Sequence, residues 1–305
     1  MAQLVLILQF ALPGAIAIAT LEALFLALVM RKNYNWRAYF ASLADALGRE
    51  YVVMTFLTLS ITAPAVGFAW KHRLFTVPLD TVTSVVLLVI LQDFSYYWFH
   101  RASHRIRWFW ATHAIHHSSN ELNLAASYRF GWTGRLTGAG LFYVPMIWLG
   151  FAPGPVFIAG GFGLLYQFWI HTEWIPKLGW LEYVLNTPSH HRVHHAANPE
   201  YLDRNYGGIL IVWDRLFGTF VSERDDVPCR YGLVTPLRSN NPVIIAFHEW
   251  GALARDIWQA RSWRERLMSV IGPPAPHPDA SHPATPAPER PARTESEPAA
   301  LSATI

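Results

Sequence analysis

The longest uncharged stretch of the chain narrows its possible folds more than any other feature. The 35 residues of Leu136–Ile170 include no Asp, Glu, Lys or Arg. About 20 apolar residues cross a bilayer core as a helix, in which all backbone polar groups are satisfied internally. Gly150 and the 153–155 Pro-Gly-Pro segment interrupt the stretch and predict a helical hairpin, shallow or re-entrant because each arm is only about 15 residues long. Both ends of this hairpin should therefore emerge on one membrane face.

Three other apolar stretches are about as long as a membrane span or longer. Leu4–Met30 contains only Glu22, Val52–Trp70 contains no charge, and Thr81–Phe99 contains only Asp93. Hydrophobic residues make up 52% of the chain and charged residues 15%, and the mean hydropathy is +0.19. These values are high for a soluble domain. We expect an all-α protein, an integral-membrane helical bundle.

Basic residues predict how this bundle is oriented. Arg31, Lys32 and Arg37 follow the first stretch, and several arginines surround the histidines described below. The excess of basic residues on cytoplasmic loops places both regions on the cytosolic side, although Lys71 and Arg73 favour the opposite assignment. We predict a multi-pass protein of the bacterial inner membrane, or of the endoplasmic reticulum in a eukaryote, with a cytosolic cap. The net charge of +3 calls for no nucleic-acid partner.

Ten of the 14 histidines lie between residues 100 and 195. On a helix, side chains three and four positions apart project from one face, so each cluster predicts a compact group directed at one point. A single isolated histidine would more often cap a helix or pair with a phosphate group at the membrane surface. Eight clustered imidazoles exceed what one transition-metal ion takes from a protein, so we predict two ions. The three clusters are His100 and His104; His113, His116 and His117; and His191, His194 and His195.

The sequence around these clusters carries a resemblance to a known family. The segments are QDFSYYWFHR (92–101), THAIHHSS (112–119), LLYQFWIHTE (164–173), LNTPSHHRVHH (185–195) and DRNYGGILIVWDRLFGTF (203–220). They resemble the fatty acid hydroxylase and sterol desaturase superfamily of integral-membrane di-iron enzymes, and look most like its alkylglycerol monooxygenase branch. In that branch an acidic residue follows the second histidine of the first cluster, whereas Arg105 follows His104 here.

The resemblance implies an enzyme that inserts oxygen into a lipid C–H bond, with an ether lipid as the implied substrate. Its partners would be a membrane lipid, dioxygen and an external electron donor, with tetrahydrobiopterin as one candidate donor. The chain itself contains no dinucleotide-binding fingerprint or haem attachment motif. Two iron ions would be held by His100, His104, His113, His116, His117, His171, His191, His194 and His195.

Three alternatives remain open from the sequence. One is a sterol or fatty-acyl desaturase or hydroxylase that uses a separate electron donor. Another is a zinc-dependent membrane hydrolase, which would usually add a carboxylate as general base, and no cluster contains one. The third is a metal-binding membrane protein without catalytic activity.

Four further polar residues are predicted to support the metal site. Asp93 lies seven residues before His100 on the same helix face, where an intramembrane carboxylate needs a partner. We expect it to accept a hydrogen bond from a ligand imidazole, which would fix the tautomer of that ring. Asn205 and Asp214 are candidates for the same role, with loop capping as the commoner alternative. His190 precedes the third cluster and is expected to pack behind it.

Composition divides the chain into three regions. Residues 1–80 are predicted to form membrane anchor spans, residues 81–270 the catalytic domain, and residues 271–305 a disordered tail. Nine of the 21 prolines fall in the final 34 residues, a bias typical of disordered segments. Ile244–Leu267 is predicted to be an amphipathic helix that lies on the membrane interface or packs onto the cytosolic cap.

Overall fold

The regular secondary structure of the described residues is helical. The computed structural model describes residues 2–55 and 60–274, so most of the predicted tail lies outside the described part of the chain. Two isolated β-bridges, Leu185–Leu210 and Ala196–Tyr231, supplement the helices. The helices are α1 (Ala2–Gln9), α2 (Ala11–Leu24), η1 (Phe25–Val29), α3 (Trp36–Thr55), α4 (Thr62–Lys71), α5 (Val82–Arg105), α6 (Arg107–His117), α7 (Gly134–Thr137), η2 (Ala139–Tyr143), α8 (Val144–Leu149), α9 (Pro153–Trp169), η3 (Gly179–Tyr183), α10 (Pro188–His194), α11 (Val212–Leu216), α12 (Pro242–Gln259) and α13 (Trp263–Ile271).

Within residues 2–55 and 60–274, two helical segments are long and apolar enough to cross a membrane, Ala11–Val29 and Val82–Arg105. Helix α5 starts with a capping box, in which the Thr81 hydroxyl accepts a hydrogen bond from the Ser84 backbone N–H at 3.2 Å. Its first half exposes apolar side chains, and Val82 is 81% exposed, whereas its last turns bury the polar side chains of His100, Ser103 and His104. Apolar residues at one end and buried polar residues at the other suit a helix that enters the protein from lipid.

Two predicted helices are divided in the structure. Val52–Trp70 was expected as a single span. Residues 56–59 of this stretch lie outside the described residues; before them α3 extends to Thr55, and after them Ser60 is not helical and α4 begins at Thr62. Pro64 lies in the first turn of α4, where its missing N–H is tolerated, so this proline is placed for a helix start. The prediction of one continuous amphipathic helix over Ile244–Leu267 is also wrong. Helix α12 ends at Gln259, and α13 begins at Trp263. The Ser262 hydroxyl caps α13 by accepting a hydrogen bond from the Glu265 backbone N–H at 3.2 Å.

The predicted hairpin has two unequal arms. Its first arm consists of the short helices α7, η2 and α8, and its second is the 17-residue α9. The chain turns at Gly150, which has a φ of +123°, while Pro153 opens α9 instead of breaking it. The Gly150 carbonyl accepts a hydrogen bond from the Val77 N–H at 3.0 Å. This turn is therefore fixed against the segment that precedes α5.

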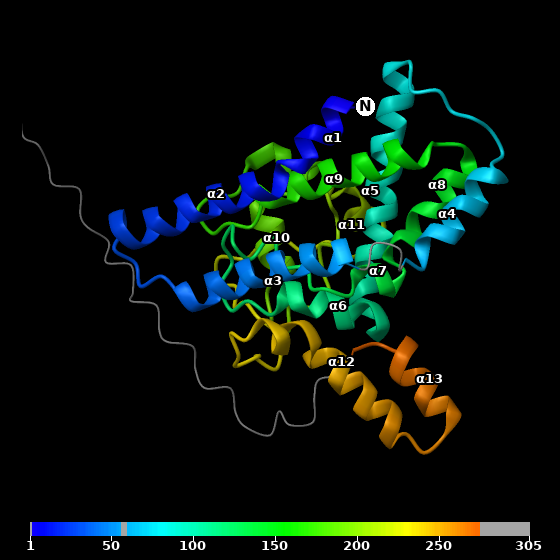
Figure 1. Ribbon diagram of the computed structural model, residues 1–305. Helices are drawn as coiled ribbons and strands as arrows, with labels where there is room; N and C mark the ends of the chain where they lie inside the picture. The colour runs from blue at the N-terminus through cyan, green and yellow to red at the C-terminus, as the bar shows by residue number, and fades with distance from the viewer. Residues whose placement is uncertain (1, 56–59, 275–305) are drawn as a thin grey trace, which may run out of the picture. The chain divides into compact units, whose positions relative to one another are not determined.

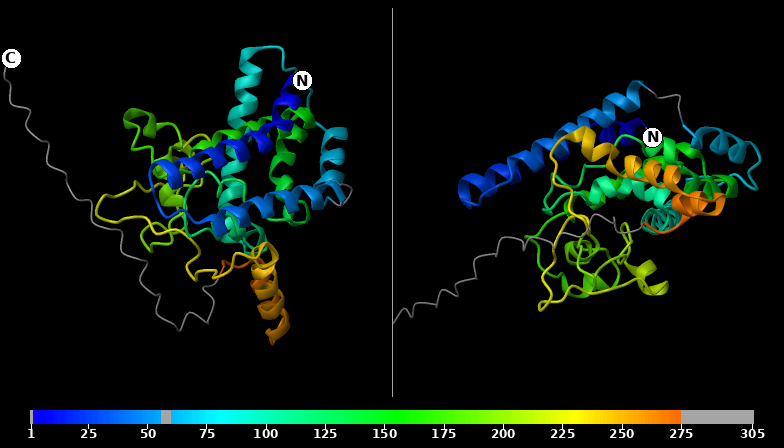
Figure 2. Two further views of the ribbon diagram at one scale, coloured as in Figure 1. Left: turned by 60° about the vertical axis from the view of Figure 1, so that its left-hand side comes forward. Right: turned by 90° about the horizontal axis from the view of Figure 1, so that it is seen from below.

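Helix α5 is central to the packing that positions the histidines. It contacts α6, η2 and α9, and α6 also contacts α12 and α13 (Figure 1). One buried cluster joins α4, α5, α8 and α9 through Leu88, Met146, Ile147, Phe151 and Val156, among others. Helices α12 and α13 lie side by side as an antiparallel pair (Figures 1 and 2). This packing fixes α6 and the end of α9 against α5, whose last turns carry His100 and His104.

Replacing Gly150 with alanine should destabilise the hairpin turn. A Cβ atom there would lie 2.5 Å from the Phe75 carbonyl oxygen, and a φ of +123° is one that alanine rarely adopts. We expect a loss of about 1–3 kcal/mol in the free energy of unfolding, measured as a lower thermal midpoint of the purified protein. Gly67→Ala is the control, because that helical glycine has nothing within 4 Å of its Cβ position. Equal midpoints for the two variants would contradict this account.

Candidate metal centre

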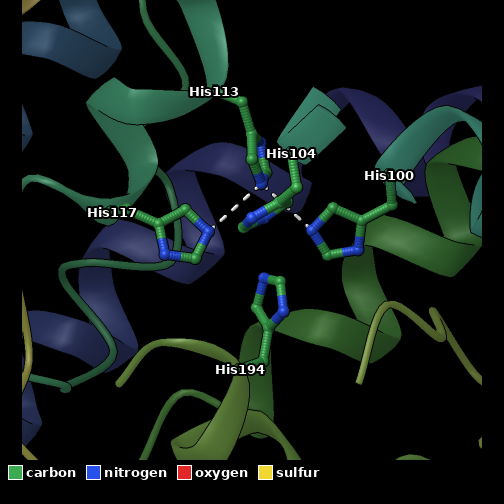
Figure 3. Close-up of side chains that lie close together, drawn as sticks. All are labelled: His100, His104, His113, His117 and His194. Carbon is green, nitrogen blue, oxygen red and sulfur yellow. Dashed lines mark hydrogen bonds between the residues drawn. The ribbon is translucent and has the colours of Figure 1, made fainter. Parts of the chain in front are cut away.

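All nine predicted ligand histidines come together in two groups. The five-histidine group is His100, His104, His113, His117 and His194, and the four-histidine group is His116, His171, His191 and His195. Within each group the candidate ligand nitrogens lie within 4.8 Å of one another. Eight of these side chains are buried and His113 is half-buried. The rings of the five-histidine group point toward a common centre (Figure 3).

The second and third sequence clusters are each divided between the two groups. His113 and His117 of α6 join the five-histidine group, whereas His116 joins the four-histidine group. In the same way, His194 joins the five-histidine group while its neighbours on either side join the other. Successive residues on a helix are about 100° apart, so adjacent histidines point to different sides while residues four apart stay aligned. The prediction that each cluster converges on one point is therefore wrong for α6 and α10.

Backbone carbonyls orient many of the rings. A neutral imidazole that donates its Nδ1–H to a carbonyl presents the lone pair of Nε2 on its opposite edge. This arrangement orients rings from three helices and one loop toward the two centres. The Nδ1-to-oxygen distances are 2.8 Å from His100 to Tyr206, 3.2 Å from His116 to Arg129, 2.7 Å from His171 to Gln167 and 2.9 Å from His194 to Arg204.

The inward-facing nitrogens fit a transition metal. The Nε2 atoms of His104, His194 and His195 are buried and have no hydrogen-bond partner among the described residues. Other Nε2 atoms face each other at close range, as in the 2.9 Å separation between His171 and His191. Buried nitrogens without partners are rare in proteins, and a metal ion would satisfy several at once. Imidazole binds iron, zinc, copper and nickel, so the donor set suits this class of metal.

Burial also keeps the clustered histidines neutral. Desolvation lowers the pKa of His171 to about 4. It lowers the pKa of His191 and His195 well below the ordinary value, and the neighbouring imidazoles reinforce the effect. A protonated imidazole cannot ligate a metal, whereas a neutral one offers its lone pair. These rings are therefore in the ligand form at neutral pH.

Asp93 does not bind an imidazole, contrary to the prediction from its helix position. One carboxylate oxygen accepts from the Ile209 N–H at 2.7 Å. The other accepts from the Leu210 N–H at 3.0 Å and from the Trp213 indole at 2.9 Å. Both oxygens thus accept hydrogen bonds from the loop that precedes α11 and from the first turn of that helix. Asp93 anchors this loop to α5.

Asp214 and Asn205 likewise bind backbone instead of histidine rings. Asp214 accepts hydrogen bonds from the N–H groups of Tyr206 and Gly207, both at 2.7 Å. The Tyr206 carbonyl in turn accepts a hydrogen bond from the His100 ring. Asp214 therefore helps to position that ring by binding the backbone of Tyr206. The Asn205 amide donates to the carbonyls of His190 and Val221.

His190 lies outside both histidine groups. Its Nε2 is 3.8 Å from a Glu182 carboxylate oxygen, and its ring packs against Phe220.

Asp203 lies beside the site and was not predicted from the sequence. Its carboxylate oxygens lie 3.4 Å from Nδ1 of His104 and 3.6 Å from Nη1 of Arg105. Arg105 stands where an acidic residue was expected from the resemblance described above. Here it pairs with the Asp203 carboxylate, which comes from a loop far away in the sequence. The φ of +60° at Asp203 has no clear signature in sequence, although Asp tolerates this conformation better than most residues.

A cavity of about 190 Å³ adjoins both histidine groups. His113 of the five-histidine group and His116 and His171 of the four-histidine group line one side of it. Most of its remaining surface is apolar. Polar contributions include the Tyr96 hydroxyl, which donates to Gln167 at 2.7 Å. Other lining residues come from α3, α5, α6, α7, η2 and α9 and from the segment between α6 and α7, among them Arg49, Phe99, Phe109, Phe130 and Leu164.

Comparison with known proteins identifies similar sequences. Residues 85–219 match the fatty acid hydroxylase family. The chain is 39% identical to human alkylglycerol monooxygenase over 216 residues, which is 70% of this chain and 48% of the human protein. It is 42% identical to the zebrafish (Danio rerio) protein of that name over 214 residues, 70% of this chain and 47% of that protein. An ornithine lipid hydroxylase of Rhizobium tropici is 36% identical over 141 residues, 45% of this chain and 41% of that protein.

The chain spans about half the length of the alkylglycerol monooxygenases named above. The matched region of the family, residues 85–219, contains all nine clustered histidines, Asp203 and the carboxylates Asp93 and Asp214. Arg49 and the rest of α3 lie before it. No solved structure matches the chain.

Asp214→Asn should destabilise the loop that holds His100. An asparagine side chain replaces one acceptor oxygen with a donor, so it cannot accept from the Tyr206 N–H, the Gly207 N–H and the Thr219 hydroxyl together. We expect a loss of about 1–3 kcal/mol in the free energy of unfolding. Thermal unfolding of the purified variant measures it. Asp225→Asn is the matched control, because that side chain is 95% exposed and should change the midpoint little.

Proposed function

We propose that the chain is a membrane-bound di-iron oxygenase that inserts oxygen into a lipid C–H bond, a function supported by the match of residues 85–219 to the fatty acid hydroxylase family. One observation carries the proposal: a mostly apolar cavity borders histidines of both groups. A substrate held there would have its C–H bond next to both centres. In the overall reaction, a C–H bond and dioxygen become a C–OH group and water, with two electrons and two protons from an external donor.

Each histidine group would hold one iron ion. His100, His104, His113, His117 and His194 would bind the first, and His116, His171, His191 and His195 the second. Iron at these positions would supply the activation of dioxygen. Neither group includes a carboxylate among the described residues, and neither does the cavity lining, which favours an oxygenase over a zinc hydrolase that would use a carboxylate there as general base.

The protein residues would bind and orient the lipid. Phe99, Phe109 and Leu164 give the cavity an apolar surface that excludes water from the reacting carbon. Tyr96 and Gln167 form a hydrogen-bonded polar pair on the same cavity surface. The pair offers a fixed contact for an oxygen atom of the substrate beside the histidines.

The names of the relatives favour hydroxylation of a lipid that carries a polar headgroup. Alkylglycerol monooxygenases and an ornithine lipid hydroxylase share this region of sequence. We therefore place an ether lipid first among the substrates and desaturation second. Tetrahydrobiopterin or a redox protein would supply the electrons from outside the chain.

We further propose a multi-pass arrangement with the histidine groups on the cytosolic side. Residues 1–80 would serve as the anchor, residues 81–270 as the catalytic domain and residues 271–305 as the tail. The two helices long enough to cross a membrane, Ala11–Val29 and Val82–Arg105, support the membrane location. The histidines at the C-terminal end of α5 would then face the cytosol.

The proposed reaction is tested with purified protein, an alkylglycerol, an electron donor and isotopically labelled dioxygen. We expect one labelled oxygen atom in the lipid product, and about two iron ions per chain in protein purified without oxygen. Because the groups share no histidine, His104→Ala and His195→Ala should each lower the content to about one iron and abolish turnover.

His248→Ala is the control, because this half-buried histidine lies in neither group. Bound zinc with no iron-dependent oxygenation would refute the di-iron proposal. Loss of both ions in each single variant would refute the division into two groups.

Topology is tested with single cysteines in a Cys229→Ser background. Asn120 and Glu200 are exposed and follow the second and third histidine clusters, and exposed Asp80 precedes α5. If α5 spans the membrane, cysteines at positions 120 and 200 should react with a membrane-impermeant reagent from the cytosolic side, and a cysteine at position 80 from the other side. Reaction of positions 120 and 80 from the same side would contradict a spanning α5.

A further inference from the structure

Arg49 is the cationic side chain that lines the cavity beside the histidines. It lies four residues after Asp45 in α3, so the two side chains share a helix face. Asp45 accepts hydrogen bonds from the N–H groups of Phe130 and Gly131, both at 3.1 Å. The Trp132 indole donates to the Asp45 carbonyl at 3.0 Å. These contacts fix α3, and with it Arg49, against the loop that carries Phe130.

Phe130 connects Arg49 to the four-histidine group. Its ring stacks on His116 with a centroid separation of 5.4 Å and an interplanar angle of 9°. The Arg49 guanidinium carbon lies 5.4 Å from the centre of the same ring. Phe130 therefore lies between His116, a candidate metal ligand, and the positive charge of Arg49, with a distance of 5.4 Å to each. The cavity surface includes all three side chains.

The hydrogen-bonding capacity of Arg49 is incompletely used. Nη2 lies 3.0 Å from a carboxylate oxygen of Glu50, whose side chain is 48% exposed. Nε is buried and has no hydrogen-bond partner among the described residues. A guanidinium group beside an apolar cavity is stabilised by an anionic acceptor, which also satisfies its N–H donors.

We propose that Arg49 binds the anionic headgroup oxygens of the lipid substrate, a phosphate or a carboxylate. The inference rests on the proposed oxygenase function and adds the class of headgroup and the region of the lipid that is oxidised. A cavity of about 190 Å³ is smaller than sites that enclose a drug-sized ligand, so it holds only part of a lipid. With the headgroup at Arg49, the carbons that reach His116 are those near the headgroup. The remainder of the chain extends out of the cavity.

The test compares three lipids with the same alkyl chain: a neutral alkylglycerol, its phosphate monoester and a carboxylate-bearing analogue. The wild-type protein, Arg49→Gln, Arg49→Lys and Glu50→Gln are each assayed in nanodiscs. For Arg49→Gln we expect KM to rise about tenfold to a hundredfold for an anionic lipid, because a charged hydrogen bond contributes about 1.5–3 kcal/mol. Its kcat should change little, and KM for the neutral lipid should stay within about twofold. The lipid that shows the larger change distinguishes phosphate from carboxylate.

Glu50→Gln separates headgroup binding from the ion pair within α3. It removes the partner of Nη2 but keeps the guanidinium, so KM for the anionic lipid should not rise. Arg49→Lys keeps the charge and should restore part of the preference for the anionic lipid. Equal KM changes for neutral and anionic lipids in Arg49→Gln, or the same defect in Glu50→Gln, would overturn the proposal.

Lipid binding distinguishes failure of this inference from failure of the proposed function. Native mass spectrometry of the purified protein measures binding of the same three lipids without turnover. Weaker binding of the anionic lipid to Arg49→Gln than to wild type supports the headgroup site even if no product forms, in which case only the oxygenase function fails. Normal turnover by wild type with unchanged anionic-lipid binding and KM in Arg49→Gln overturns the headgroup site alone.

Discussion

The rest of the structure depends on nine neutral imidazoles in two adjoining groups, eight of them buried and one half-buried. Each buried ring has two nitrogens, and a buried nitrogen without a partner is unfavourable. Backbone carbonyls satisfy the outer nitrogen of several rings, which leaves the inner nitrogen directed at a common centre. The chain must therefore hold these carbonyls in place as firmly as the histidines. Much of the fold around α6 and α10 serves that requirement.

Buried carboxylates hold the loops that supply these carbonyls, and three of them use the same arrangement. In each case an aspartate side chain accepts hydrogen bonds from two consecutive backbone N–H groups. Such bonds favour the ionised carboxylate and fix the loop in one conformation. The three are Asp45 with Phe130 and Gly131, Asp93 with Ile209 and Leu210, and Asp214 with Tyr206 and Gly207.

The loop between α6 and α7 links the metal centre to the cavity. The Arg129 carbonyl orients His116, and the next residue, Phe130, stacks on that ring and lines the cavity. The Arg129 side chain and the Asp45 carboxylate fasten this loop to α3. A change in α3 would therefore affect both the cavity surface and the orientation of His116, although α3 lies before the region that matches the family.

The sequence by itself determined the helical class, the nine clustered histidines and the similarity to the fatty acid hydroxylase family, because hydropathy and residue spacing are local properties. It also predicted that His190 lies outside the ligand set. Only the tertiary structure decided how the ligands divide. Neighbouring histidines on one helix point about 100° apart, and which centre each reaches depends on how α5, α6, α9 and α10 pack. The partners of Asp93 and the positions of Asp203 and Arg49 also depended on the tertiary structure, because each contact joins segments far apart in the chain.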